Sequence, residues 1–378
     1  MKALSQSARR GVTIHDVAGR AGVSIATVSR VLRGTARVTD GTRDRVEQAV
    51  RELGFVPSRP AQSLAEGRHA ANGIVLPDLS GPYYAEVLLG YEETAGELGR
   101  SVLIRSTRGK ADTRELVLDL AARVDGLVIL GYGVPDAVVR EVAANGTPIV
   151  LLARERVDGL DCVRVQNTAS ATALGRHLTG HGHRTFWFLG DPALSPDVAQ
   201  RLAGLQAAAG TVRVIPCELD EPAGERAAAT ALAGGHFTPD VLVCANDELA
   251  LGAMFVCKRL GLAVPGDVAV TGWDDVMAAR HVEPGLTTVR QPMRELGAHA
   301  ALALDRRLGG AGDTHQPHDE VLPSRLVVRG SCGRHRQAGD WAGDTAGNWA
   351  GDTAGDWAGD RAGDRAGDSA GTGEEEGQ

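Results

Sequence analysis

The fold at the start of this chain is decided by residues 13–32, TIHDVAGRAGVSIATVSRVL. Apolar side chains recur there every three or four residues, in one set around Val17 and a second around Val31, which predicts two amphipathic helices. Between the sets, Gly22 tolerates the positive φ of a tight turn, and Ser24 can cap the second helix. Two helices joined by a tight turn form either an ordinary helical hairpin or the helix-turn-helix, whose second helix enters the major groove of DNA.

The neighbourhood of this helix pair favours the DNA-binding alternative because it is basic. Residues 1–68 contain 12 basic and 6 acidic side chains, whereas the whole chain of 378 residues has a formal net charge of −8. Clustered positive charge attracts phosphate groups. Thr39 can cap a third helix that Gly54 would end, so we expect a compact three-helix headpiece over residues 1–57.

From residue 73 onward, short apolar runs alternate with helical segments. This alternation is typical of right-handed βαβ units and of parallel sheets covered on both faces. Nine strands exceed one small domain, so we expect an α/β fold with two doubly wound subdomains, joined near residues 160–165 and 289–292. The predicted strands are residues 74–76, 102–104, 127–130, 149–152, 162–165, 185–189, 212–215, 241–244 and 268–271.

The composition favours a globular protein of the cytoplasm. Hydrophobic residues make up 43% of the chain and charged residues 23%,. The five cysteines are scattered and include no Cys-x-x-Cys pair, as expected of free thiols in a reducing compartment,. No stretch reaches ~18 uninterrupted apolar residues, and the basic N-terminal region lacks a signal-peptide core. We therefore expect a cytoplasmic protein with no membrane contact.

The end of the chain has a different character. Residues 338–369 are eight tetrapeptides of the form Ala-Gly-Asp/Asn-x, in which three Trp are the only large apolar side chains. Such a segment cannot bury enough surface to offset its ordering entropy, so residues 334–378 are predicted to be a disordered tail. Calcium binding by its aspartates is an alternative, but the spacing matches no known Gly-Asp calcium repeat.

Taken together, the motifs resemble the LacI/GalR family of bacterial transcriptional repressors over residues 12–332. Besides residues 13–32 they include VLPDLS (75–80), RVDG (123–126), GHR (182–184), RLAG (201–204), GWDD (272–275) and PGLTTV (284–289). The resemblance implies a headpiece, a hinge helix and an effector domain of the periplasmic-binding-protein type 1 fold. The expected divisions are 1–57 (headpiece), 58–72 (hinge helix and linker), 73–161 with 292–319 (N-subdomain), 162–291 with 320–333 (C-subdomain) and 334–378 (tail).

For the headpiece, the resemblance implies that the second helix contacts bases of double-stranded DNA through Ile25, Ala26 and Arg30. The chemistry agrees, because Arg can make a bidentate contact to guanine while Ile and Ala offer apolar contacts, for instance to a thymine methyl. Burial of Ile25 and Ala26 in a core is the alternative, although other residues already fill the apolar stripe. Hydroxyl or backbone contacts to phosphate would come from Thr13, Ser24, Thr27 and Ser29.

Residues 58–66 resemble the family's hinge helix. By that resemblance Leu64, with Ala61 and Gln62 beside it, enters the minor groove and kinks the duplex. The segment is too short to be stably helical alone in water, so the hinge of a second subunit would order it. Ser58 stands where the family usually has Asn. The resemblance thus implies a homodimer on a palindromic operator.

The effector site is expected where strands end, because ligands of open α/β sheets bind outside the carboxyl ends of the strands. Carboxylates, amides and Arg around a Trp suit a polyol, so a small sugar is the expected effector. A purine or a phosphorylated metabolite is the alternative. Gln166 stands where many sugar-responsive members carry Asp, and Leu219 where relatives often place an aromatic residue. The predicted effector-binding residues are Asp78, Ser80, Tyr83, Arg154, Gln166, Arg201, Asn246, Asp247, Trp273 and Asp274, although Asp247 could instead brace a loop.

No catalytic constellation is recognisable, so we expect neither an enzyme nor a cofactor. The sequence lacks a Gly-x-Ser-x-Gly elbow, a Walker loop and a His-Glu-x-x-His motif. His177, His181 and His183 have the spacing of a metal cluster, but Gly-His-Arg after a helix is usual in the resembled family, and no metal is expected. A periplasmic-type sugar-binding protein is the alternative from another class, and the basic headpiece argues against it.

Overall fold

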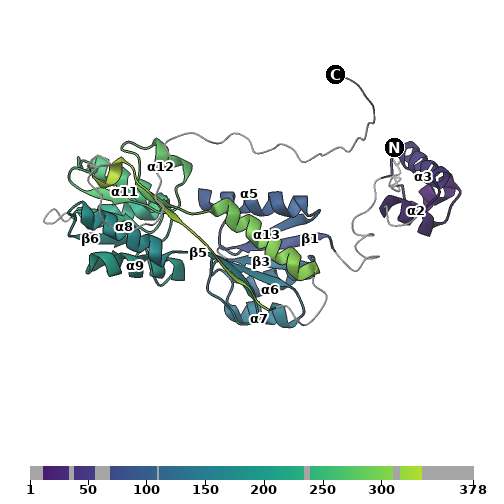
Figure 1. The fold of residues 1–378 in the computed structure, drawn as a ribbon, viewed down its shortest axis with the longest axis horizontal. Coiled ribbons are helices and arrows are strands. Elements are labelled where there is room, and N and C mark those ends of the chain that lie inside the picture. Colours follow the sequence, from purple (N-terminus) through teal and green to yellow (C-terminus); the bar gives the residue numbers. More distant parts are fainter. Residues whose placement is uncertain are drawn as a thin grey trace, which may run out of the picture. The chain divides into compact units, whose positions relative to one another are not determined.

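A computed structural model of the chain describes residues 12–33, 38–55, 69–108, 110–233, 239–309 and 316–333. They form a helical headpiece and an α/β region with two parallel sheets, each covered by helices (Figure 1). The predicted hinge residues Ala61, Gln62 and Leu64 and the predicted tail 334–378 lie outside the described residues. In the described ranges, no helix is both long and apolar enough to cross a membrane.

The headpiece has the predicted helix-turn-helix. Helix α1 (Ile14–Ala21) begins with a capping box, in which the backbone N and Oγ1 of Thr13 both donate to Oδ2 of Asp16, at 2.8 and 2.7 Å,. It ends at Gly22, whose φ of 67° lies in the left-handed region that favours glycine,. Helix α2 (Ile25–Arg33) starts at Ser24, whose Oγ accepts from the backbone N of Thr27 at 3.2 Å. The predicted cap is confirmed.

A third helix completes the headpiece. Helix α3 (Asp40–Leu53) begins after Thr39 and ends at Gly54, with φ 61°, as predicted. The three helices share a small core that fixes their crossing angles and leaves the other faces in solvent. Its buried apolar side chains are Val17, Ala18, Ala21, Val28, Val46, Ala49 and Phe55.

The first sheet has six parallel strands in the order β11-β5-β4-β3-β1-β2. Helices α5 (Pro82–Glu97) and α13 (Met293–Gly309) cover one face, and α6 (Thr113–Ala121) and α7 (Asp136–Ala144) cover the other. The strands are β1 (Ala71–Leu76), β2 (Ser101–Ser106), β3 (Gly126–Leu130), β4 (Ile149–Leu152), β5 (Asp161–Val165) and β11 (Asp319–Leu322).

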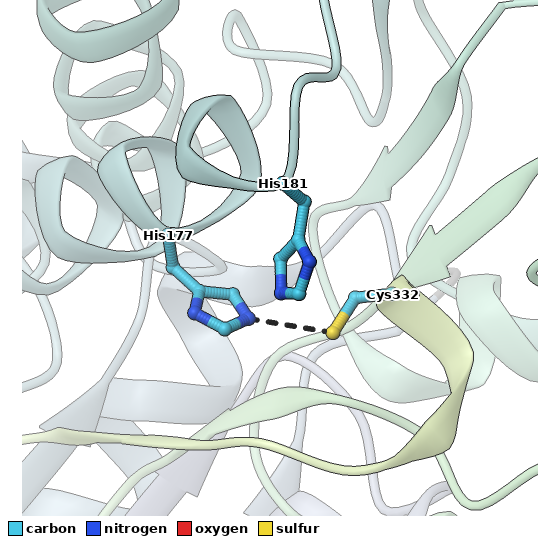
Figure 2. Close-up of side chains that lie close together, drawn as sticks. All are labelled: His177, His181 and Cys332. Atoms are coloured by element: carbon cyan, nitrogen blue, oxygen red, sulfur yellow. Dashed lines mark hydrogen bonds between the residues drawn. The ribbon is translucent and has the colours of Figure 1, made fainter. Parts of the chain in front are cut away.

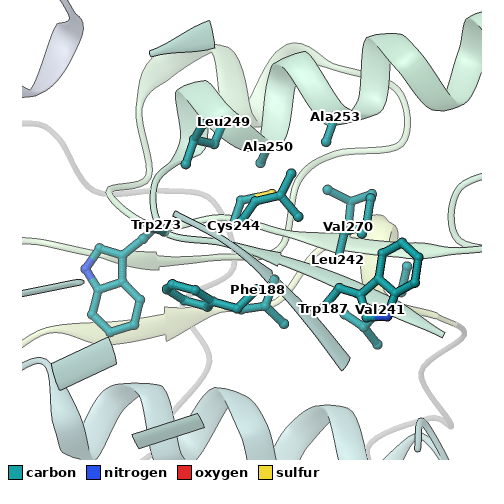
Figure 3. Close-up of a cluster of buried hydrophobic side chains, with 14 of the residues drawn as sticks. Trp187, Phe188, Val241, Leu242, Cys244, Leu249, Ala250, Ala253, Val270 and Trp273 are labelled. Carbon is teal, nitrogen blue, oxygen red and sulfur yellow. The ribbon is translucent and has the colours of Figure 1, made fainter. Parts of the chain in front are cut away.

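The second sheet has four parallel strands in the order β7-β6-β8-β9. Isolated bridges extend it from β9 to β10 (Thr288–Arg290), which pairs antiparallel with β12 (Arg325–Val327). Figure 3 shows the core between this sheet and its helices, with Phe188 and Cys244 from the strands and Leu249 from a covering helix. The other elements are β6 (Phe186–Leu189), β7 (Val212–Ile215), β8 (Val241–Cys244), β9 (Ala269–Thr271), α8 (Thr168–Gly180), α9 (Pro196–Ala209), α10 (Glu221–Leu232), α11 (Asp247–Arg259), α12 (Met277–His281) and η1 (Gly330–Cys332).

All nine predicted strands are present, but the division between the sheets differs from the predicted one. We placed residues 162–165 and 320–322 in the second subdomain, whereas β5 and β11 pair with each other in the first sheet. A cross-strand ion pair, Arg164 Nη2 to Asp319 Oδ2 at 2.7 Å, accompanies this pairing. An apolar run looks the same in either sheet, so only its long-range partner decides where it belongs. The chain therefore first passes between the sheets after Val165.

Candidate functional site

The residues predicted to contact bases lie on the outer side of α2. Ile25 is 39% exposed, and Ala26 and Arg30 are exposed as well, whereas Val28 between them is fully buried in the headpiece core. This difference follows from the helical period, because residues three or four apart share one face of a helix and only one face of α2 packs on the core. Burial of Ile25 and Ala26 in the core is thus wrong. The exposed face of α2 is free to meet the edges of base pairs.

Two of the four residues predicted to contact phosphate, Thr13 and Ser24, also cap helices. The hydroxyls of Ser24 and Thr27 share a hydrogen bond of 2.9 Å, and the hydroxyl of Thr13 donates to Asp16. Ser29 is half-buried on α2. Three of these side chains therefore shape the starts of α1 and α2, where backbone N–H groups point outward and favour an anion.

A cavity of about 370 Å³ lies at the carboxyl ends of strands from both sheets. This volume is within the ~300–1,000 Å³ typical of small-molecule sites. Four predicted effector-binding residues line it, namely Tyr83, Arg201, Asn246 and Asp274. Prediction missed other polar or aromatic lining residues: Tyr84, Tyr132, Ser195, Asp197, Glu248 and Gln291.

Arg201 is the one Lys or Arg side chain among the described lining residues. Hydrogen bonds to neighbouring residues fix its position. It is buried on α9, where Nε donates to Oδ1 of Asn167 at 3.0 Å and Nη1 donates to the carbonyl of Ala245 at 2.6 Å. Its guanidinium carbon lies 4.7 Å from the centre of the Trp273 ring. The two hydrogen bonds and the ring fix the orientation of the guanidinium group.

Trp273 does not line the cavity, contrary to its predicted role as the cover of a sugar face. Its side chain is only 2% exposed, and it belongs to the hydrophobic core around the second sheet (Figure 3). The indole stacks on Arg201 and thereby helps to position this cation, which does line the cavity. The aromatic lining comes instead from Tyr83, Tyr84 and Tyr132.

Asp274 is a strained and buried acid at the cavity wall. Its φ is 118°, which is unusual for a residue other than Gly and is a feature that often marks binding sites,. The side chain of Gln291 donates to its Oδ1 at 2.5 Å. Burial raises the pKa of Asp274 from 3.8 to about 7, against the opposing effect of the Arg201 charge. Near neutral pH this group can therefore either donate or accept a hydrogen bond.

Two further carboxylates line the cavity. Asp197 begins α9 and accepts from Nδ2 of Asn167 at 3.1 Å. Burial raises its pKa, while the charge of Arg201 lowers it. Burial also raises the pKa of Glu248, and the negative charges of Asp220 and Asp78 add to the effect. Three carboxyl groups thus face a single guanidinium, which makes this cavity better suited to hydroxyl donors than to anions.

Several predicted effector residues have other roles in the structure. Asp247 is fully buried and accepts from Oγ1 of Thr288 at 2.6 Å and from the backbone N of Val276 at 2.9 Å. It braces the loop that carries Asp274, which is the alternative we left open for it. Asn246 lines the cavity but also caps α11, accepting from the backbone N of Leu249 at 3.0 Å.

Asp78, Ser80, Arg154 and Gln166 are not brought to the cavity wall. Asp78 accepts from Oγ of Ser80 at 2.6 Å and forms an ion pair with Arg108 at the surface. Gln166 is exposed between the sheets. Arg154 is buried, donates to the carbonyl of Val134 at 3.1 Å, and lies 5.2 Å from the ring centre of Tyr132. It supports that lining tyrosine from outside the cavity.

Comparison with known proteins agrees with this geometry. Residues 13–58 match the family described as bacterial regulatory proteins, lacI family, and residues 176–332 match the periplasmic binding protein-like domain. The chain is 31% identical over 349 residues to the HTH-type transcriptional repressor CytR of Escherichia coli (strain K12), an alignment that covers 88% of this chain and 98% of the relative.

Solved structures resemble the chain over a similar length. A Lac repressor dimer bound to operator and the anti-inducer ONPF has a TM-score of 0.77 and 28% identity, covering 86% of this chain and all of that one. A complex of the transcriptional regulator CelR with cellobiose has a TM-score of 0.62 and 29% identity, covering 85% and 99%. The chain therefore belongs to the LacI family of bacterial regulatory proteins and is a DNA-binding transcriptional regulator with an effector-binding domain.

Proposed function

We propose that this regulator represses transcription as a homodimer on a palindromic operator, and that a small sugar bound in the 370 Å³ cavity modulates its DNA binding. The observation that carries the ligand class is the presence of both Arg201 and Asp274 in the cavity wall. One is a fixed donor of hydrogen bonds and the other an acid that can accept or donate, which is what adjacent hydroxyl groups require,.

The charge of the cavity favours a neutral polyol over a phosphorylated metabolite. Asp197, Glu248 and Asp274 oppose Arg201, so a phosphate would meet more carboxylates than cations,. A carbohydrate instead donates its hydroxyls to those carboxylates and places its C–H faces on tyrosine rings. The similar CelR structure holds cellobiose, which fits the same ligand class.

A nucleoside is the second candidate, because the cavity has more aromatic surface than a single sugar needs. The rings of Tyr83 and Tyr84 lie edge to face with centroids 5.4 Å apart, and Tyr132 also lines the cavity. One of these rings can stack on a purine base, and a second can meet the edge of the base, while the carboxylates bind ribose hydroxyls. The cavity would thus accept a nucleoside without a phosphate more readily than a nucleotide.

DNA recognition is proposed to combine two elements. Ile25, Ala26 and Arg30 on the exposed side of α2 would contact base edges in the major groove, with Thr13, Ser24, Thr27 and Ser29 at the phosphates,. The hinge residues Ala61, Gln62 and Leu64 would enter the minor groove, as their resemblance to the family implies. Such a regulator acts in the cytoplasm, where its operator lies.

The coupling between ligand and operator would pass through the arrangement of the two sheets. Residues of both subdomains line the cavity, Tyr83 and Tyr132 from the first and Asp197 and Asp274 from the second. A ligand that contacts both sets stabilises the arrangement in which they are close. It shifts the population of DNA-binding states only insofar as it binds one arrangement better than the other.

Two experiments test these proposals separately. Selection of bound duplexes from a randomised pool at low salt would recover a palindromic site, whereas failure to retain any duplex would refute operator binding. A thermal-shift screen of sugars, nucleosides and sugar phosphates would identify the ligand class. A shift with sugars supports the proposal, and a shift confined to nucleosides or phosphates would overturn the sugar assignment.

A further inference from the structure

Two histidines and a cysteine from distant parts of the chain converge at the C-terminal end of α8 (Figure 2). His177 lies in the last turn of α8 and His181 is its C-cap, so their spacing of four residues places them on one side of the helix,. Cys332 approaches from η1, 151 positions further along the chain. The sequence alone grouped His183 with the two histidines, whereas the structure replaces it with Cys332.

The distances suit a tetrahedral metal ion. One nitrogen from each imidazole and the sulfur of Cys332 all lie within 4.8 Å of one another, the one such group found among the described residues. Nε2 of His177 lies 3.4 Å from the sulfur. In a tetrahedral zinc site with Zn–S of ~2.3 Å and Zn–N of ~2.0–2.1 Å, these atoms would be about 3.5 Å apart. The nitrogen–sulfur separation of His177 is already suitable, and small side-chain rotations would bring in His181.

The cysteine is held in place by a rigid second layer of contacts. Oγ1 of the buried Thr287 lies 3.0 Å from its sulfur and 3.1 Å from the carbonyl oxygen of Arg329, which keeps the sulfur in a fixed position,. Nε2 of His183 hydrogen-bonds the carbonyl oxygen of Cys332 at 2.9 Å. Ser331 beside it donates to the carbonyl of Val270 at 2.6 Å, which fastens η1 to β9. His183 therefore orients the cysteine instead of competing for the ion.

The opposite side of the group is open enough for a further ligand. Cys332 is fully buried, whereas both imidazoles are half-buried and lead to the surface. Because the imidazoles are only half-buried, water can reach them and complete the coordination of a bound ion.

We propose that His177, His181 and Cys332 bind a zinc ion or a chemically similar late transition-metal ion, with water as the fourth ligand. Two imidazoles and one thiolate are ligands that zinc prefers, whereas calcium and magnesium require oxygen. Bound metal would tie η1, at the end of the second subdomain, to α8. Its role would be to stabilise this subdomain, independently of which effector occupies the cavity.

Cobalt(II) substitution tests the proposal on the full-length wild-type chain, freed of metal by chelation and kept reduced. A thiolate ligand gives cobalt a sulfur-to-metal charge-transfer band in the near ultraviolet, and tetrahedral geometry gives intense visible bands. We expect both bands to saturate at one ion per chain. Absence of the charge-transfer band in the folded wild-type chain would overturn the proposal, whatever the variants do.

Variants then assign the ligands. Cys332→Ser should remove the charge-transfer band, and His177→Gln and His181→Gln should each weaken binding at least tenfold. Cys217→Ser and His281→Gln are matched controls, because neither residue lies in the cluster, and they should bind cobalt normally. A charge-transfer band that survives Cys332→Ser but disappears in Cys217→Ser would refute the assignment.

Zinc should also raise the melting temperature of the wild-type chain by about 5–10 °C at a free concentration 100 times its Kd. The rise should be absent in His181→Gln, a half-exposed position where the change itself perturbs folding little. If zinc stabilises this variant and the wild type equally, metal binds elsewhere and the proposal is wrong. Circular dichroism of each metal-free variant shows whether it is folded.

Discussion

Replacement of Asp274 by asparagine tests the description of the cavity without knowledge of its ligand. Asp274 as a whole residue is 4% exposed, and burial raises the pKa of its carboxyl group from 3.8 to about 7. A pKa difference of about 3 corresponds to about 4 kcal/mol of destabilisation once the acid is fully ionised. Asparagine has nearly the same shape, tolerates positive φ and stays neutral, so Asp274→Asn avoids this penalty.

The sign follows from linkage. Because the folded-state pKa is raised, the unfolded chain loses its proton first, and the stability associated with this group falls as the pH rises from about 4 to about 7. The penalty is about 2 kcal/mol at pH 5 and about 4 kcal/mol at pH 8. Asp274→Asn should therefore be more stable than the wild type at pH 8, and its advantage should shrink by about 2–3 kcal/mol at pH 5.

Thermal unfolding of the ligand-free chain, followed by circular dichroism between pH 5 and pH 8, measures this difference. A change of 2–3 kcal/mol corresponds to about 5–10 °C in the gap between the two melting temperatures. Asp275→Asn is the matched control, because the buried Asp275 is paired with Arg290 and Arg329, both at 2.5 Å, and its loss should destabilise the chain,. The reasoning is refuted if Asp274→Asn melts below the wild type at pH 8, or if the gap is independent of pH.

Three further substitutions have defined outcomes. Arg30→Ala should relax discrimination at one operator base pair, by about 1–3 kcal/mol, as measured by gel retardation with single-base variants of the selected site; unchanged specificity would remove Arg30 from the base-contacting set. Asp247→Ala should lower the free energy of unfolding in urea by about 2–5 kcal/mol, because it leaves the buried Thr288 hydroxyl and the Val276 N–H without their acceptor; a loss below about 1 kcal/mol would contradict the bracing role,. Arg201→Met should weaken binding of the ligand found by the screen by at least tenfold in a calorimetric titration, and unaltered affinity would exclude this cation from the site.

Local chemistry made much of the fold predictable. The two helices of residues 13–32 follow from the three- and four-residue spacing of small apolar side chains, and their turn follows from Gly22, so nothing outside the segment is needed to recognise it. The nine predicted strands were recognisable for the same reason, because each is a short apolar run. The strands we missed, β10, β11 and β12, are short and partly polar, as Asp319–Leu322 illustrates.

The cavity was only partly predictable. Asn246 follows the carboxyl end of β8, Asp274 follows that of β9, and Arg201 lies in α9, the helix after β6. The rule that ligands bind at the carboxyl ends of strands selected all three, and all three line the cavity,. The same rule also selected Asp78 and Gln166, which the structure leaves in surface loops. We did not select Tyr132, although it follows the carboxyl end of β3 and the rule applies to it; only the structure shows that Arg154 packs against its ring.

The sequence by itself determined that this protein binds DNA and that an α/β domain follows the headpiece. Helical periodicity, the basic charge of residues 1–68 and each family motif can all be recognised from the residue types along the chain, without knowledge of which distant segments touch. Only the tertiary structure decided that β5 pairs with β11, that Trp273 supports Arg201 from the core, and that Cys332 meets His177 and His181. Each of these is a contact between residues far apart in the chain. Such contacts depend on how whole elements pack, which no local pattern specifies.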